Sequence, residues 1–253
     1  MIKIEITPRS LEKYLAFNLK EGLSPELWDE EEQLRPSIKA AVLAVVKDFL
    51  AGLDLSALVL EDVVITGSLA NYNWSEFSDI DVHLLVDFKE INPNVELVKK
   101  FFDAVKSNWN KLHDIRVKGY ELELYVQDVS EPHISTGVYS VHRDAWLVKP
   151  KRVKPEIDRT GAKKKARFIQ REVDKLEKIY DNGDYEEAFS VATQIKNKIK
   201  RMRKMGLDRA GIYSPENLAF KILRRSGDIR SLFEIYTNAY DKNLSLAETV
   251  QDA

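Results

Sequence analysis

Two short apolar stretches, separated by a polar segment, constrain this chain more than any other feature. The first covers residues 63–66 and ends in Gly67-Ser68; after ten intervening residues, the second runs from Asp79 to residue 86. Both stretches have the length and composition of buried strands. Side chains two residues apart in a strand point to the same face, so Asp79 and Asp81 are expected to project side by side.

These residue types indicate a site for a metal ion and a phosphate group. Two carboxylates this close repel each other unless a cation lies between them. Oxygen ligands of this kind suit Mg²⁺ or Mn²⁺. The Gly67-Ser68 turn offers backbone N–H groups and a hydroxyl, which suit phosphate oxygens.

This arrangement resembles the nucleotidyltransferase superfamily, which includes DNA polymerase beta, the antibiotic nucleotidyltransferases and the poly(A) polymerases. The resemblance covers about residues 60–127 and rests on Gly67-Ser68, a spacer, Asp79-x-Asp81 and a later acidic strand. It implies metal-dependent transfer of a nucleoside monophosphate from a nucleoside triphosphate to a hydroxyl, with Mg²⁺ or Mn²⁺ as cofactor. It further implies that Asp79 and Asp81 are metal ligands and that Gly67 and Ser68 contact the triphosphate.

The resemblance also calls for a third catalytic carboxylate on a later strand. Glu121 and Glu123 share a strand face, so periodicity alone does not choose between them. Glu123 is favoured because it lies between two leucines in an apolar stretch, whereas Glu121 lies nearer the start of the strand. Asp128 lies beyond this strand and is expected to be a cap or a solvated residue. His83 shares the face of the aspartates, either near the substrate or as a partly buried structural histidine.

The composition excludes several other chemistries and compartments. The chain has no cysteine, which excludes disulfides, thiolate metal sites and a cysteine nucleophile. No apolar run approaches the ~20 residues that span a bilayer, and the N-terminus lacks a signal-peptide core. A cytoplasmic protein with no membrane partner is therefore expected; the sequence defines no oligomeric state.

The net charge of −2 conceals a strong asymmetry along the chain. Residues 1–148 carry 15 basic and 25 acidic side chains, a net of −10, and residues 149–204 carry 18 and 9, a net of +9. This shift predicts a catalytic domain at residues 1–150 and a basic helical domain at residues 151–253. The basic runs at residues 163–167 and 196–204 are available to a triphosphate or a nucleic acid, or form a solvated face.

The predicted fold is α+β, with a mixed-sheet nucleotidyltransferase domain followed by a C-terminal helical bundle. Strands are expected near residues 63–66, 79–86, 115–126, 138–141 and 145–148; the fourth and fifth flank a turn at Arg143. Residues 115–126 form either one strand or two that meet at a tight turn near Gly119. Further helices are expected at residues 8–19, 25–34, 36–50, 69–74, 95–112, 169–180, 185–205, 215–225 and 229–240.

Three more specific or rival functions stay open beside transfer to a hydroxyl. The enzyme can modify a protein, as toxin–antitoxin nucleotidyltransferases do, or extend an RNA or DNA end. It can also be an inactive nucleotide- or nucleic-acid-binding protein on the same fold. The intact carboxylate set, Asp79, Asp81 and Glu123, argues against the inactive protein.

Overall fold

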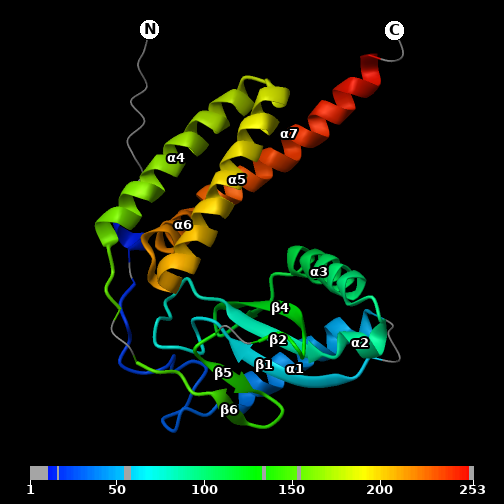
Figure 1. Ribbon diagram of the computed structural model, residues 1–253, viewed down its shortest axis with the longest axis vertical. Helices are drawn as coiled ribbons and strands as arrows, with labels where there is room; N and C mark the ends of the chain where they lie inside the picture. The colour runs from blue at the N-terminus through cyan, green and yellow to red at the C-terminus, as the bar shows by residue number, and fades with distance from the viewer. Residues whose placement is uncertain (1–10, 16, 54–57, 133–134, 153–154, 251–253) are drawn as a thin grey trace. The chain divides into compact units, whose positions relative to one another are not determined.

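The computed structural model describes residues 11–15, 17–53, 58–132, 135–152 and 155–250. These residues form two compact units, shown in Figure 1. One unit comprises residues 17–154 and contains the sheet. The other comprises residues 155–253 grouped with residues 1–16, and its described part is helical. The α+β prediction, with a mixed sheet and a C-terminal helical region, is confirmed.

The first unit is built on a six-stranded sheet with the order β3-β4-β2-β1-β5-β6. Strands β2 and β4 run parallel, and every other neighbouring pair is antiparallel. The strands are β1 (Leu60–Thr66), β2 (Ile80–Val86), β3 (Arg116–Val117), β4 (Tyr120–Asp128), β5 (Val138–Ser140) and β6 (Ala145–Val148). The helices of this unit are α1 (Pro36–Ala51), α2 (Phe88–Ile91) and α3 (Val95–Leu112).

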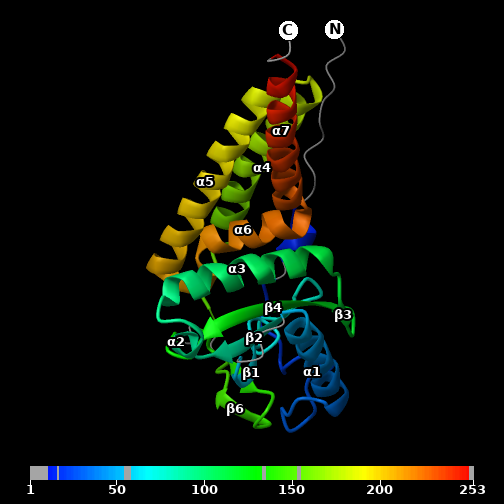
Figure 2. The ribbon, with the colours of Figure 1, turned by 90° about the vertical axis from the view of Figure 1, so that its right-hand side faces the viewer.

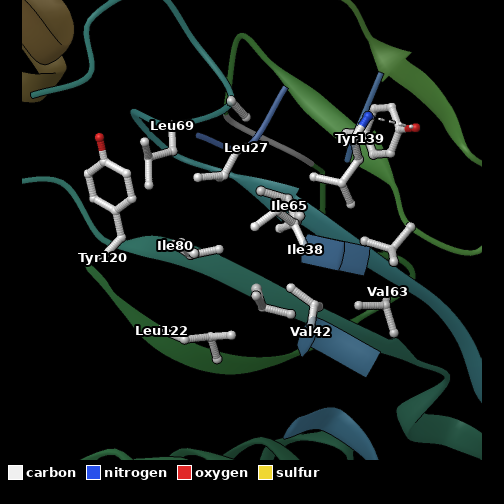
Figure 3. Close-up of a cluster of buried hydrophobic side chains, with 14 of the residues drawn as sticks. Leu27, Ile38, Val42, Val63, Ile65, Leu69, Ile80, Tyr120, Leu122 and Tyr139 are labelled. Atoms are coloured by element: carbon white, nitrogen blue, oxygen red, sulfur yellow. Dashed lines mark hydrogen bonds between the residues drawn. The ribbon is translucent and has the colours of Figure 1, made fainter. Parts of the chain in front are cut away.

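One face of the sheet is buried under α1, where Ile38 and Val42 pack against β1 and β2 (Figure 3). Along β2, buried Ile80, Val82 and Leu84 alternate with half-buried residues. This alternation leaves polar side chains on the opposite face of the sheet. The core therefore holds β2 rigidly while its polar positions stay accessible to a ligand.

Helix α3 covers part of the edge of β4 (Figure 2). The Asn110 side chain donates to the carbonyl of Leu124 at 3.0 Å and accepts from its N–H at 3.1 Å. A single amide thus satisfies both backbone groups of one strand residue, as a neighbouring strand would. This contact anchors β4 one residue from Glu123.

Two of the predicted helices are turns instead. Residues 25–34 form turns closed by a bridge between Trp28 and Leu34, and Trp28 is buried. The indole Nε1 of Trp28 donates to the carbonyl of Leu69 at 2.8 Å, and Asn71 Nδ2 donates to the carbonyl of Gly67 at 2.6 Å. The Trp28 side chain therefore takes the Leu69 carbonyl, which a helix over residues 69–74 would use for the N–H of residue 73.

The second unit consists of helices that bury a common apolar core and are capped by Asp158, Asp184 and Ser214. They are α4 (Arg159–Asp181), α5 (Tyr185–Ala210), η2 (Gly211–Tyr213), α6 (Pro215–Ser226) and α7 (Asp228–Val250). The short helix η1 (Glu12–Tyr14) joins them, because Arg225 Nη1 donates to the carbonyl of Tyr14 at 3.0 Å.

Several helix ends differ from the predictions; helix α4, for example, begins ten residues before the predicted residue 169. Gly206 does not end α5, because it lies buried inside the helix, where an added Cβ would be 2.5 Å from the Cβ of Glu216. Helix α7 extends ten residues beyond the predicted Tyr240. Of the predicted helix over residues 8–19, the described part contains only η1; residues 8–10 and 16 lie outside the described residues. No described helix has both the length and the apolar character needed to cross a membrane.

Candidate metal centre

Three carboxylates from two adjacent strands meet on the polar face of the sheet. The parallel register of β2 and β4 places Asp81 directly beside Glu123, and Asp79 lies just before β2, two residues from Asp81. One carboxylate oxygen of each residue lies within 4.8 Å of the other two, and all three side chains are half-buried. Glu121 is not part of this group; its carboxylate lies 3.7 Å from the guanidinium of Arg116.

The Gly-Ser turn is packed directly against this cluster. Gly67 has φ +74°, and a Cβ added there would lie 1.7 Å from the Oδ2 of Asp81. Two independent requirements, the left-handed backbone and the close carboxylate, therefore select glycine at this position. The contact between Gly67 and a triphosphate stays a prediction; in the structure, the group that lies close to Gly67 is the Asp81 carboxylate.

We expect Gly67→Ala to disrupt the carboxylate cluster. The new Cβ would push Asp81 away and strain the turn, so divalent-metal affinity should fall by at least about tenfold. The measurement is calorimetric titration with Mn²⁺, with the melting temperature recorded in parallel. Gly22→Ala is the matched control, because no atom lies within 4 Å of its added Cβ. Equal Mn²⁺ affinity in the two variants would contradict the assigned role of Gly67.

Hydroxyls order the segment that links the turn to β2. Ser68 Oγ donates to Ser78 Oγ at 2.8 Å, and the same Ser78 oxygen accepts from the N–H of Ser75 at 3.0 Å. Ser75 and Ser78 are buried, whereas Ser68 is half-buried. The contact between Ser68 and a phosphate stays a prediction.

Tyr125 supports Glu123 from two residues further along β4. Its hydroxyl donates to Glu123 Oε2 at 2.5 Å. Burial raises the pKa of Tyr125 far above its usual range, and the charges of Glu123, Asp81 and Asp79 raise it further, so the phenol stays a donor. Tyr125 was not among the predicted site residues, although its two-residue spacing from Glu123 places it on the same strand face.

His83 takes part in the packing beside this cluster. Its ring stacks on Tyr125 with centroids 4.9 Å apart, and its Nδ1 lies 2.8 Å from Gln127 Oε1. These contacts orient His83 on the face of the aspartates, where both sequence interpretations had placed it. Asp128 is the last residue of β4 and does not lie beyond the strand as predicted. It is not solvated: its buried carboxylate accepts from the N–H groups of Phe88 and Ser130, while Asp87 is the N-cap of α2.

Removing the Tyr125 hydroxyl should weaken the site without unfolding the protein. Groups that hold a metal-binding carboxylate in place contribute about 10- to 100-fold to metal affinity or activity. Tyr125→Phe is therefore expected to lower Mn²⁺ affinity about tenfold in the same titration. The control is Tyr120→Phe on the same strand, since the Tyr120 hydroxyl has no hydrogen bond to another described residue. An unchanged affinity in Tyr125→Phe would remove this tyrosine from the site.

The donor set fits a hard divalent cation. It consists of oxygens only, and three carboxylates in so small a space are mutually repulsive unless positive charge lies among them. Asp79, Asp81 and Glu123 can therefore hold a metal ion. A scan against protein-family models, a search of curated proteins and a search of solved structures each found no match.

Proposed function

We propose that this protein is a metal-dependent nucleotidyltransferase that moves a nucleoside monophosphate from a nucleoside triphosphate to a hydroxyl acceptor. The observation that carries the proposal is the carboxylate cluster: Asp81 and Glu123 side by side on parallel strands, Asp79 beside them, and Gly67 packed against Asp81. If these carboxylates only formed a solvent-exposed strand face, no glycine would be needed at position 67 to leave room for Asp81.

The proposed reaction is an in-line displacement at the α-phosphorus. The acceptor oxygen forms a bond to this phosphorus, the bond to the bridging oxygen of the β-phosphate breaks, and pyrophosphate leaves. Divalent ions such as Mg²⁺ or Mn²⁺, when bound, supply positive charge for the attacking and leaving oxygens. Asp79, Asp81 and Glu123 are the residues that would hold them.

The protein side chains have distinct roles in this proposal. Asp79 and Asp81 would hold a metal ion on the side of the triphosphate, next to the N–H groups of the Gly67-Ser68 turn. Glu123 serves the acceptor side and helps remove the hydroxyl proton. The hydrogen bond from Tyr125 limits the rotation of the Glu123 carboxylate. The polar face of the sheet would thus supply groups for both the leaving pyrophosphate and the attacking hydroxyl.

A labelling experiment tests the proposal and identifies the acceptor class. The protein is incubated with each of four α-labelled triphosphates, Mg²⁺ or Mn²⁺, and separate RNA and protein fractions of a cell extract. Metal-dependent label in either fraction supports nucleotidyl transfer; label in protein alone identifies the protein-modifying alternative. Binding of a non-hydrolysable triphosphate with no labelling under any condition would support the inactive binding protein instead.

A further inference from the structure

The outward face of α4 carries a row of positive charge, with the half-buried Asp174 beside it. Its five members are spaced three or four residues apart, which places them on one side of the helix. They are Lys164, Arg167, Arg171, Lys175 and Lys178, called here the α4 stripe. All five are exposed, and none of their side chains has a hydrogen bond or ion pair with another described residue. At 1.5 Å per residue, the stripe is about 20 Å long.

Unpartnered charges in this arrangement are unfavourable for the isolated protein. Like charges at these spacings destabilise a helix. Elsewhere in the described chain, many basic side chains have acidic partners, for example Lys39 with Asp144 at 2.6 Å and Lys165 with Glu216 at 3.2 Å. A bound polyanion would convert the repulsion along the α4 stripe into attraction.

A groove of about 590 Å³ between α4 and α5 borders the stripe. Lys175 lies on one wall, and Gln194, Asn197 and Arg201 lie on the other. Arg201 is exposed and likewise has no ion pair with a described residue. The groove therefore adds a further cation and two amide side chains, which can donate hydrogen bonds to phosphates or base edges. Glu172 also lines the groove, and its negative charge is balanced by Lys198 at 2.8 Å.

An exposed aromatic ring lies close to these charges. Phe168, also on α4, is 53% exposed, and the Lys198 ammonium lies 4.1 Å from its ring centroid. Lys198 is held in turn by Glu172 on α4 at 2.8 Å. A ring held next to a basic row is the combination that binds unpaired bases, because every base has a stacking face. A membrane-binding helix would instead need a broad apolar face.

We propose that the α4 stripe and the adjoining groove bind single-stranded nucleic acid through its phosphodiester backbone. The inference rests on the proposed function only in taking the bound strand as the hydroxyl acceptor. The structure also changes which basic residues are expected to contact the nucleic acid. Lys165 is paired with Glu216, and the Lys196 ammonium lies 3.1 Å from the ring centroid of Tyr236. The basic runs recognised in the sequence are therefore only partly on the binding face.

The test compares two variants that lose the same charge. The stripe variant combines Arg171→Gln, Lys175→Gln and Lys178→Gln. The control variant combines Lys47→Gln, Lys89→Gln and Lys111→Gln, which are exposed residues of the sheet unit. Binding of labelled single-stranded RNA and DNA of one sequence is measured by fluorescence anisotropy across a salt series. Chelator is present throughout, so that the carboxylate cluster plays no part.

Wild type and the control variant should bind with a steep salt dependence. Losing three phosphate contacts should lower the magnitude of the log–log salt slope by about 2 in the stripe variant, and its affinity at ~0.1 M salt should fall roughly 10- to 100-fold. Binding of either RNA or DNA supports the inference, and the difference between the two affinities identifies the kind of strand that the stripe prefers. Equal binding by stripe and control variants would overturn it. So would stripe-dependent binding to anionic vesicles with no binding to either oligonucleotide.

The two proposals fail in different ways. Asp81→Asn should bind the oligonucleotides like wild type, because it removes no residue of the stripe. If wild type transfers no nucleotide but the stripe still determines binding, the proposed enzyme is wrong and the binding surface stands. If transfer occurs and the stripe variant keeps wild-type nucleic-acid affinity, the enzyme stands and the binding surface is wrong.

Discussion

Asp81→Asn is expected to reduce nucleotidyl transfer by roughly 10²–10³-fold or more, while the fold is retained. The substitution keeps the size of the side chain but removes a charged oxygen ligand, in a site where placed charge stabilises the transition state. It also removes repulsion among three carboxylates, so the melting temperature in chelator should be unchanged or higher than that of wild type. Loss of activity without loss of stability distinguishes a functional residue from a structural one.

Steady-state transfer rates and thermal melts with and without Mn²⁺ give both readouts. Asp48→Asn is the matched control, since Asp48 is exposed on α1 and its carboxylate has no hydrogen bond or ion pair to another described residue. Mn²⁺ should raise the melting temperature of wild type, and it should raise that of Asp81→Asn by less. Near-wild-type turnover by Asp81→Asn would contradict the catalytic interpretation of the cluster.

Glu123→Gln is expected to abolish transfer while triphosphate binding is retained. A carboxylate that serves the acceptor side contributes to the chemical step more than to nucleotide affinity. The rate should therefore fall by orders of magnitude, about 10² or more, with the dissociation constant of a non-hydrolysable triphosphate within a few-fold of wild type. Transfer assays and equilibrium titration with the analogue measure the two effects.

Glu121→Gln provides an unusually close control for this variant. Glu121 lies on the same strand face, two residues from Glu123, but its carboxylate lies near Arg116 and outside the cluster. It should transfer nucleotide at close to the wild-type rate. If Glu121→Gln were inactive and Glu123→Gln active, the assignment of the third carboxylate would be reversed.

The side-by-side aspartates followed from local chain geometry, whereas their third partner, Glu123, was favoured over Glu121 only by the composition around it. Alternation along residues 79–86 predicts the shared face of Asp79 and Asp81 from local chain geometry alone. The choice between Glu121 and Glu123 depends on how β4 registers against β2, a contact between segments some forty residues apart. Composition around Glu123 favoured the right residue for the cluster, but only the register places it beside Asp81.

Tertiary contacts explain the elements that sequence periodicity misjudged. Helical patterns at residues 25–34 and 69–74 are overridden because Trp28 is buried and its indole takes the carbonyl of Leu69. Gly206 reads as a helix end, yet it is required inside α5 by the close approach of Glu216. In each case a long-range side-chain contact outweighs a local propensity.

The basic residues show the same difference between sequence and space. Runs such as residues 163–165 stand out by adjacency in the sequence, but neighbours on a helix point in different directions. The α4 stripe consists of residues three or four apart and becomes evident only when the helix and its ion pairs are known. The charge asymmetry is therefore readable from the sequence, whereas the face that presents it is not.

Tracing the phosphates of the substrate tests the central claim most directly. Wild type is incubated with a divalent metal, an acceptor fraction and triphosphate labelled at either the α- or the γ-phosphate. Nucleotidyl transfer predicts that α-label enters the acceptor, that γ-label is released as pyrophosphate, and that both are lost with chelator or in Asp81→Asn. Transfer of γ-label to the acceptor, or labelling by α-phosphate that is equal in wild type and Asp81→Asn, would contradict the account.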